Sequence, residues 1–209
     1  MRLRITFAKT EAMRYTGHLD LQRTWERTLR RARLPLAYSQ GFKPHPRIVL
    51  ASALPLGCTS QHEIVDVWLE RRESLSLIKA GLSRAAPPGL QLIEVSEVAS
   101  DLTSLPSQLE ASVYQITFLA PIQELDNRIE QIIQAPEIPR VWRKKTYDLR
   151  SLILDLGRLP DDKNGCQRIL VRLAAREGAT GRPEEVVSVL GGEINKVRIH
   201  RTHLIFSSE

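Results

Sequence analysis

Hydrophobic side chains in this chain recur with two different periods, and the order of these periods restricts the fold. Residues 1–9 alternate between apolar and polar side chains, which is typical of a half-buried strand. Residues 16–33 carry apolar side chains at helical spacing, with Thr16 as the expected cap and Pro35 as the stop. The next predicted segments are strand, strand, helix and strand at residues 47–53, 63–70, 74–86 and 90–98. The first half therefore predicts the order β-α-β-β-α-β.

The same order of elements recurs in the second half. It follows residues 99–109, which hold Ser, Asp, Thr and Pro without periodicity and predict a linker. Strands are expected at residues 112–119, 138–147, 168–175 and 196–206, and helices at residues 122–134 and 183–190. Residues 148–165 form an insert whose leucines indicate a short helix or an additional strand. The halves share no visible sequence identity, so the repeat is one of element order.

Chain length is compatible with two small domains. The 209 residues are 42% hydrophobic, which is enough for two cores of about 100 residues each. We therefore expect an α+β protein of two tandem ferredoxin-like sandwiches, at residues 1–98 and 110–209. Each sandwich would have a four-stranded antiparallel sheet covered on one face by two helices.

Two simple features set the expected compartment and exclude some classes of site. No apolar run approaches the roughly 18 residues of a spanning helix, and the N-terminus lacks a signal-peptide pattern. We therefore expect a cytoplasmic protein without a membrane partner. Cys58 and Cys166 are the only cysteines and lie far apart, which argues against a disulfide framework or a zinc knuckle. We predict neither a metal nor a cofactor.

Positive charge is concentrated in one window of the first half. Glu26 is the only carboxylate between residues 23 and 47, and the cations there are Arg23, Arg27, Arg30, Arg31, Arg33, Lys43 and Arg47. The window therefore carries 7 − 1 = +6, which equals the formal net charge of the whole chain. A local positive field is typical of a surface that binds a polyanion. Arginine predominates, and guanidinium groups bind phosphate bidentately and stack on bases, which favours nucleic acid.

A stiff loop, SQGFKPHP at residues 39–46, follows the basic helix. Its glycine permits a positive φ and its prolines restrict the backbone, so Phe42, Lys43 and His45 are expected to project. Phe42 has two open interpretations, as a base-stacking surface or as a core residue. The predicted nucleic-acid-binding residues are Arg23, Arg27, Arg30, Arg31, Phe42, Lys43, His45 and Arg47. The alternative for the arginines is an ordinary solvated helix face.

Histidines raise the question of catalysis. His18, Asp20 and His45 show no metal-ligand spacing, so a metal site would have to be assembled across the fold. A general acid or base role for His18 or His45 in RNA cleavage is a further alternative, although no second partner is visible in the sequence.

A smaller basic patch lies in the second half. Asp148 is its only carboxylate, Trp142 and Tyr147 are interleaved, and its cations are Arg140, Arg143, Lys144, Lys145 and Arg150. This patch is either a second binding surface or an edge strand protected by charge.

The run YTGHLDLQRTWERTLRRARLPLAYSQGFKPHPRIVLASALPLGCTSQHEIVDV, residues 15–67, resembles the signature of a bacterial family of unknown function, the radical-SAM-associated or radical-SAM-linked family. In that family the domain stands beside a B12-binding radical SAM gene or is fused to the C-terminal side of that enzyme. The resemblance implies an accessory module. The chain itself lacks a CxxxCxxC motif and cannot hold the iron–sulfur cluster of a radical SAM enzyme.

The residues and the resemblance together predict a non-catalytic module that binds structured RNA, such as tRNA or rRNA, for a radical SAM partner. Two alternatives stay open. One is a metal-independent RNA-processing or RNA-modifying enzyme that uses His18 or His45. The other is a protein-docking domain for the radical SAM enzyme.

Overall fold

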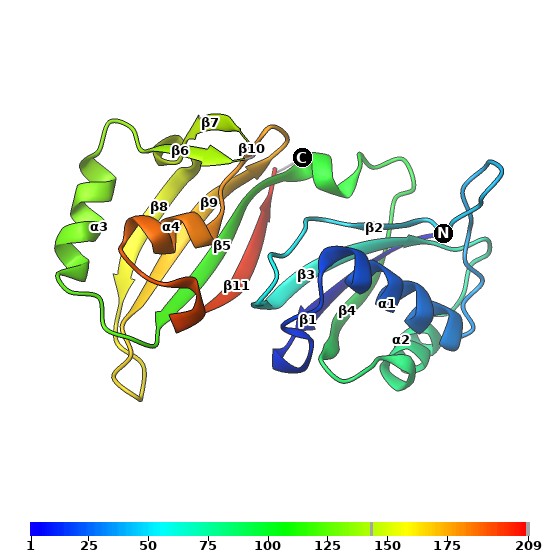
Figure 1. Ribbon diagram of the computed structural model, residues 1–209. Coiled ribbons are helices and arrows are strands. Elements are labelled where there is room, and N and C mark those ends of the chain that lie inside the picture. The colour runs from blue at the N-terminus through cyan, green and yellow to red at the C-terminus, as the bar shows by residue number, and fades with distance from the viewer. Residues whose placement is uncertain (143, 208–209) are drawn as a thin grey trace. The chain divides into compact units, whose positions relative to one another are not determined.

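The first 109 residues contain helices and strands in the order that their hydrophobic periods predict (Figure 1). The computed structural model describes residues 1–142 and 144–207. These divide into two units, Met1–Leu109 and Glu110–Glu209. The elements of the first unit are β1 (Arg2–Lys9), α1 (His18–Arg31), β2 (Ile48–Leu50), β3 (Cys58–Trp68), α2 (Leu75–Ala85) and β4 (Leu90–Val98).

The sheet of the first unit is antiparallel and has the strand order β2-β3-β1-β4. Alternate residues of β1, namely Leu3, Ile5 and Phe7, are fully buried in one core with residues of α1 and α2. The ring of Trp25 in α1 meets that of Phe7 edge-on, with 4.9 Å between the ring centroids. Both helices therefore cover one face of this sheet, which fixes the face that α1 turns to solvent.

The ends of α1 differ in part from expectation. Gly17 is the residue before the helix, so the expected cap at Thr16 is wrong. Among the described residues no capping hydrogen bond from a side chain forms at this end. Burial of Leu21, Trp25 and Leu29 positions the helix instead. At the other end Arg33 adopts a left-handed conformation, with a φ of 57°, and turns the chain out of the helix before Pro35.

The second unit repeats the strand order with additions. Its elements are β5 (Leu109–Phe118), α3 (Leu125–Gln134), β6 (Pro139–Trp142), β7 (Lys145–Asp148), β8 (Ile153–Leu159), β9 (Arg168–Arg176), β10 (Ala179–Thr180), α4 (Pro183–Val189) and β11 (Val197–Phe206). Strand β9 pairs antiparallel with β5, β8 and β10, and β11 lies next to β5. The described residues thus form a mixed α and β fold with four α-helices and mostly antiparallel strands.

The segment between α3 and β9 differs from the prediction. Residues 138–147 are not one strand but the hairpin β6-β7, which forms a separate two-stranded sheet. Lys144 in its turn has a φ of 68°, a conformation that ends a strand. The place in the main sheet is taken by β8, whose Ile153 and Leu156 are buried. The expected insert therefore supplies a sheet strand, because it has the buried apolar residues that the exposed hairpin lacks.

The predicted linker, residues 99–109, is tied to the first unit. The buried Arg2 guanidinium donates hydrogen bonds to the carbonyl oxygens of Leu102, at 2.6 Å, and Thr103, at 3.1 Å. Leu105 is fully buried. Among the residues that the structure describes, no helix is long and apolar enough to cross a membrane.

Candidate nucleic-acid interface

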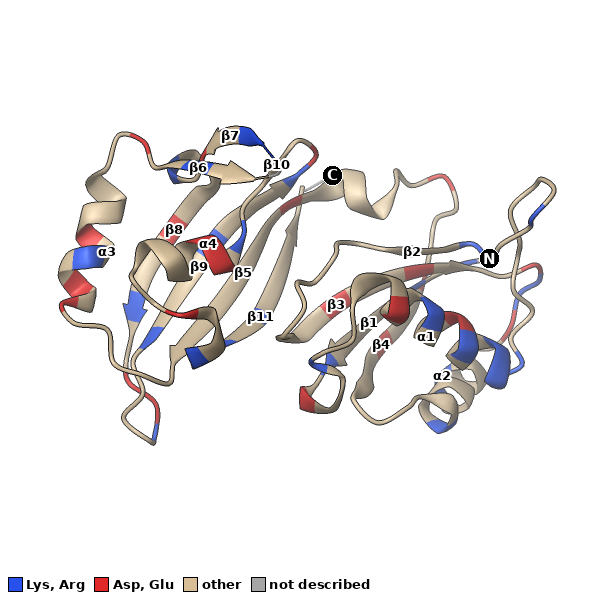
Figure 2. Ribbon diagram, viewed as in Figure 1, with Lys and Arg blue, Asp and Glu red and all other residues tan. Residues whose placement is uncertain are grey.

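The outer face of α1 carries the predicted arginines in exposed positions. Arg23, Arg27, Arg30 and Arg31 all lie opposite the face that Leu21, Trp25 and Leu29 bury. Figure 2 shows bands of positive charge along α1 and at the end of α2. The amphipathic spacing of the sequence therefore directs the guanidinium groups to solvent.

Two of these arginines have partners within the helix. Arg23 pairs with Asp20 at 3.2 Å, and Arg30 pairs with Glu26 at 2.7 Å. Exposed pairs of this kind contribute only about 0.2–1 kcal/mol each, so an incoming phosphate can compete for either guanidinium. Arg27 and Arg31 form no ion pair with any residue that the structure describes. Their charge is available for a ligand.

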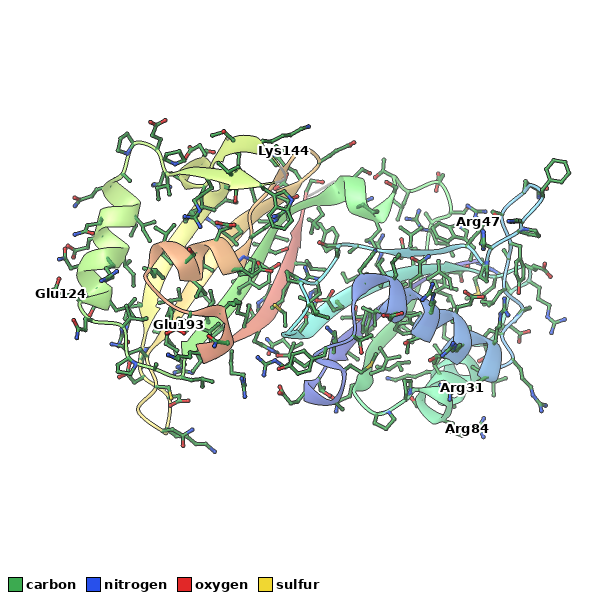
Figure 3. All side chains as sticks on the ribbon, in the orientation of Figure 1. Arg31, Arg47, Arg84, Glu124, Lys144 and Glu193 are labelled. Atoms are coloured by element: carbon green, nitrogen blue, oxygen red, sulfur yellow. The ribbon has the colours of Figure 1, made fainter. Side chains whose placement is uncertain are left out.

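The arginines border a hollow surface where α1 and α2 end. Two adjoining depressions, of about 530 and 670 Å³, share Arg31, Pro87 and Pro88 in their walls. We call the two depressions together the arginine groove. Its cationic side chains are Arg27, Arg30, Arg31, Arg33 and Arg84. Figure 3 labels Arg31 and Arg84, which come from the ends of α1 and α2.

Arginines at these positions also stabilise the helices. Arg30 and Arg31 lie in the last turn of α1, and Arg84 lies in the last turn of α2. A cation near a helix C-terminus interacts favourably with the unpaired carbonyl groups, by about 0.3–1 kcal/mol. This interaction leaves most of the guanidinium donors unused. Among the described residues no carboxylate pairs with Arg33 or Arg84 either.

Sequence reasoning missed Arg84 and the two prolines of this groove. The sequence of α1 alone does not indicate them, because only the fold brings the end of α2 beside the end of α1. The available signal was that a proline follows shortly after the end of each helix and that both helices carry arginine in the last turn.

The loop after α1 is flanked by two backbone segments, residues 37–39 and 45–47, that are hydrogen-bonded to each other. We call this paired part of the loop the stalk. Ala37 donates its amide hydrogen to the carbonyl of Trp68, at 2.8 Å, and Arg47 donates to the carbonyl of Ala37, at 2.8 Å. One step farther out, Ser39 donates to the carbonyl of His45, at 2.8 Å, and the His45 amide donates to the Ser39 Oγ, at 3.0 Å. The stalk holds residues 40–44 away from the sheet.

The tip of this loop presents an aromatic ring and a cation. Gly41 has a φ of 128°, a conformation that side chains other than hydrogen rarely allow. Phe42 beside it is fully exposed, at 108% of the reference area. The interpretation of Phe42 as a core residue is therefore wrong. Lys43 and His45 are exposed as well, and neither side chain has a hydrogen-bond partner among the described residues.

Arg47 stands at the base of the stalk. Its guanidinium lies over the ring of Trp68, 4.7 Å from the centroid, and that of Arg2 lies 4.9 Å from the same centroid. Arg2 is held in turn by the buried carboxylate of Asp66, at 2.7 Å. Arg47 thus anchors the loop as well as carrying charge. Figure 3 places Arg47 apart from Arg31 and Arg84. Most of the predicted residues therefore belong either to the groove or to the loop and its base, whereas Arg23 lines neither depression.

The histidine alternatives receive little support from the geometry. Asp20, two residues after His18, has its carboxylate in the ion pair with Arg23. The exposed His45 ring has no carboxylate beside it among the described residues, and an imidazole base usually needs such a group to orient it. Within residues 1–142 and 144–207, no three side chains gather that could hold a metal ion.

Part of the second basic patch is structural. Arg140 pairs with Glu185 at 2.5 Å and donates to the Ser188 Oγ, at 3.0 Å. Arg150 donates to the carbonyl oxygens of Ile133 and Ile153. Arg143, which the sequence also assigns to this patch, lies outside the described residues. Lys144 and Lys145 remain exposed on the hairpin.

Comparison with known proteins gives a family and a fold. A family model described as an uncharacterized protein conserved in bacteria, DUF2344, matches residues 2–183. No curated protein matches the chain.

A chain of the crystal structure of a Cbf5-Nop10-Gar1 complex is 8% identical, with a TM-score of 0.50. The match covers 97% of this chain and 48% of that one, so this chain spans about half the length of its structural neighbour, and the likeness concerns the fold alone. A candidate glycine cleavage system transcriptional repressor is 10% identical over 99% of this chain and 98% of that one. Its TM-score of 0.25 is too low to bear on the fold.

Proposed function

We propose that this chain, which belongs to the DUF2344 family of uncharacterized proteins conserved in bacteria, is a non-catalytic RNA-binding module. The observation that carries the proposal is the arginine groove. Five guanidinium groups border it, and only Arg30 is paired with a carboxylate among the described residues. Unpaired arginines around a depression are suited to bidentate contacts with phosphate.

The module would make two kinds of contact with RNA. The arginine groove holds the phosphate backbone, which gives affinity and orientation without reading sequence. The loop supplies Phe42 for stacking on an unpaired base, with Lys43 and His45 beside it. A phosphate-binding groove combined with a base-stacking tip fits a structured RNA that has both a helix and an unpaired loop, such as tRNA or rRNA.

We also infer that the two units are tandem ferredoxin-like domains. The sheet order β2-β3-β1-β4 of the first unit recurs as β8-β9-β5-β11 in the second. In each unit one helix follows the first strand of the set and another precedes the last. The neighbour that covers 97% of the chain supports a fold that extends over both units.

The resemblance in residues 15–67 supports a B12-binding radical SAM enzyme as the cytoplasmic partner of the module. In this arrangement the module presents RNA to the enzyme, and the partner carries the iron–sulfur chemistry. Docking to that enzyme is the second candidate function. It is favoured by Tyr15 and Leu56, two exposed apolar side chains next to Arg14 and Gly57, which are hydrogen-bonded to each other.

One experiment separates the candidates. The chain is purified from its host with and without nuclease, and the nucleic acid and protein that accompany it are identified. We expect RNA in the untreated sample and none after nuclease. A radical SAM enzyme that remains bound after nuclease, with no RNA in either sample, would favour the docking candidate. Cleavage of added total RNA by the pure chain in EDTA would favour the enzyme alternative.

A further inference from the structure

The second unit contains a depression of about 610 Å³ that lies outside the proposed RNA interface. It lies between the β6-β7 hairpin, the segment after β7 and strand β10, and its walls include Trp142, Lys145, Tyr147, Thr180 and Arg182. Its volume falls within the range of about 300–1,000 Å³ for small-molecule sites. All of these residues belong to one unit, Glu110–Glu209.

Arg182 is the most unusual side chain of this site. Its guanidinium carbon lies over the Trp142 ring, 3.3 Å from the centroid. It forms no hydrogen bond with any described residue, and its buried Nη1 has no partner there. A guanidinium carries five donors, and leaving a buried one unused is costly. The contact with Trp142 holds the group in place, and its donors have no hydrogen-bond partner among the described residues.

Two more donors surround the same space. Lys145 is exposed and forms no ion pair among the described residues. The buried Tyr147 hydroxyl has no hydrogen-bond partner there either. Burial, followed by the nearby Glu185 carboxylate, raises the pKa of Tyr147 above its ordinary value. The hydroxyl therefore stays protonated at neutral pH and can donate.

Two of the acidic groups near the site are already engaged, and a third, Glu184, interacts electrostatically with Arg182. Asp148 accepts amide hydrogen bonds from Ile138, Arg150 and Ser151, at 2.7 to 3.1 Å, and the bond from Ile138 chiefly lowers its pKa. Glu185 is bonded to Arg140. Among the described residues, the charges that line the depression are Lys145 and Arg182 against the single carboxylate of Asp148.

We propose that this depression binds a nucleotide, with its phosphate held by Arg182, Lys145 and the Tyr147 hydroxyl. The base would lie against the indole of Trp142, which is 44% exposed. An aromatic surface lies here beside cationic donors that have no partner among the described residues. This combination suits a phosphate joined to a planar ring better than a bare anion, because a bare anion would leave most of the volume empty. The proposal concerns other residues than those of the arginine groove and goes beyond the RNA-binding function.

The test uses the full chain labelled with ¹⁵N, in which three indole signals come from Trp25, Trp68 and Trp142. The Trp142→Phe variant assigns the signal of interest. Adenosine monophosphate is titrated against adenosine as the matched ligand without phosphate. We expect a saturable shift of the Trp142 signal with the monophosphate and affinity for adenosine at least about tenfold lower, because adenosine cannot accept the charge-assisted hydrogen bonds.

Charge variants then locate the phosphate. Lys145→Gln and Arg182→Lys should each weaken monophosphate binding about tenfold, as expected for the loss or misplacement of a charge-assisted hydrogen bond. Lys163→Gln removes an equal charge from an exposed turn of the same unit and should leave affinity unchanged. Lys145 is exposed and has no ion-pair partner among the described residues, so Lys145→Gln should fold even if Arg182→Lys does not.

A 5′-phosphorylated tetraribonucleotide distinguishes the source of the nucleotide. Tighter binding than adenosine monophosphate identifies an RNA end, and weaker binding identifies a free nucleotide. Either result supports the site. Equal affinity for adenosine and its monophosphate, an unmoved Trp142 signal, or equal losses in Lys145→Gln and Lys163→Gln would overturn the proposal. Because the titration involves no residue of the arginine groove, its outcome is independent of the RNA-binding proposal.

Discussion

At the scale of single residues, Phe42 shows how an apolar side chain can be kept out of the core. The ladder between Ser39 and His45 and the positive φ of Gly41 turn the loop tip away from the sheet. Exposing a phenylalanine ring forgoes the favourable free energy of its burial. A binding partner that covers the ring would recover that free energy.

Phe42→Ala should weaken RNA binding by about 1–3 kcal/mol, the range for losing a stack between a base and an aromatic ring. The melting temperature should stay unchanged, because the ring has no packing to lose. Affinity and thermal unfolding are measured on the same preparation. A marked fall in melting temperature, with affinity preserved, would contradict the placement of Phe42 and its role.

Asp66 is the opposite case, a charge fully buried in the first unit. Its carboxylate accepts hydrogen bonds from Arg2, at 2.7 and 3.1 Å, and from Arg4, at 2.9 Å. Asp66→Asn should lower the free energy of unfolding by about 3–5 kcal/mol, because it leaves the buried Arg2 charge uncompensated. Glu97→Gln, which breaks an exposed pair with Arg72, should cost at most about 1 kcal/mol. Denaturant unfolding measures the free energy of unfolding of both variants. A similar decrease in the two variants would refute this ranking.

At the scale of elements, the start of α4 contains an acidic group that opposes folding when it is charged. Burial raises the pKa of Glu184 above its ordinary value, and its Oε2 has no hydrogen-bond partner among the described residues. The folded state therefore holds this proton to a higher pH than the unfolded chain does. Between the two pKa values, stability falls as pH rises.

Glu184→Gln removes this titration. The free energy of unfolding of the variant, minus that of the native chain, should increase as pH rises above about 4.3, the ordinary pKa of glutamate. It should level off once Glu184 is ionised in the folded state. Urea unfolding at several pH values measures the difference. A difference that stays constant with pH, or decreases as pH rises, would show that Glu184 is not disfavoured as a charged group.

Elements of the first unit could be predicted well from sequence because their periods are unambiguous. Leu3, Ile5 and Phe7 alternate, and Leu21, Trp25 and Leu29 follow helical spacing. The single strand expected at residues 138–147 is wrong, whereas β8 lies in the insert for which a short helix and a strand both stayed open. Periodicity alone does not distinguish such short segments. The arginine groove and the nucleotide site could not be predicted, since each depends on elements that meet only in the fold.

At the scale of the whole molecule, the chain consists of two units with the same sheet order. The expected linker is partly fixed by Arg2 and by the buried Leu105. We propose that its first residues, 99–101, form an exposed connection within the first unit, between β4 and the part that Arg2 holds. Brief digestion with a protease of broad specificity should cut there first. Resistance at this segment, with rapid cleavage inside residues 47–70, would refute its role as the exposed connection.

The central claim, that the arginine groove binds RNA through its phosphates, is tested most directly by the salt dependence of affinity. The double variant Arg27→Gln, Arg31→Gln removes two unpaired groove cations and keeps good helix formers. The control Arg71→Gln, Arg72→Gln removes two exposed cations of the same unit outside the groove. Binding of tRNA is measured from low to high salt for each protein.

We predict that the slope of log affinity against log salt concentration becomes shallower by about 1.4–1.8 in the groove variant, corresponding to two lost phosphate contacts. The control should keep the slope of the native chain. Equal slopes for the groove variant and the native chain would contradict the claim and remove the arginine groove from the interface.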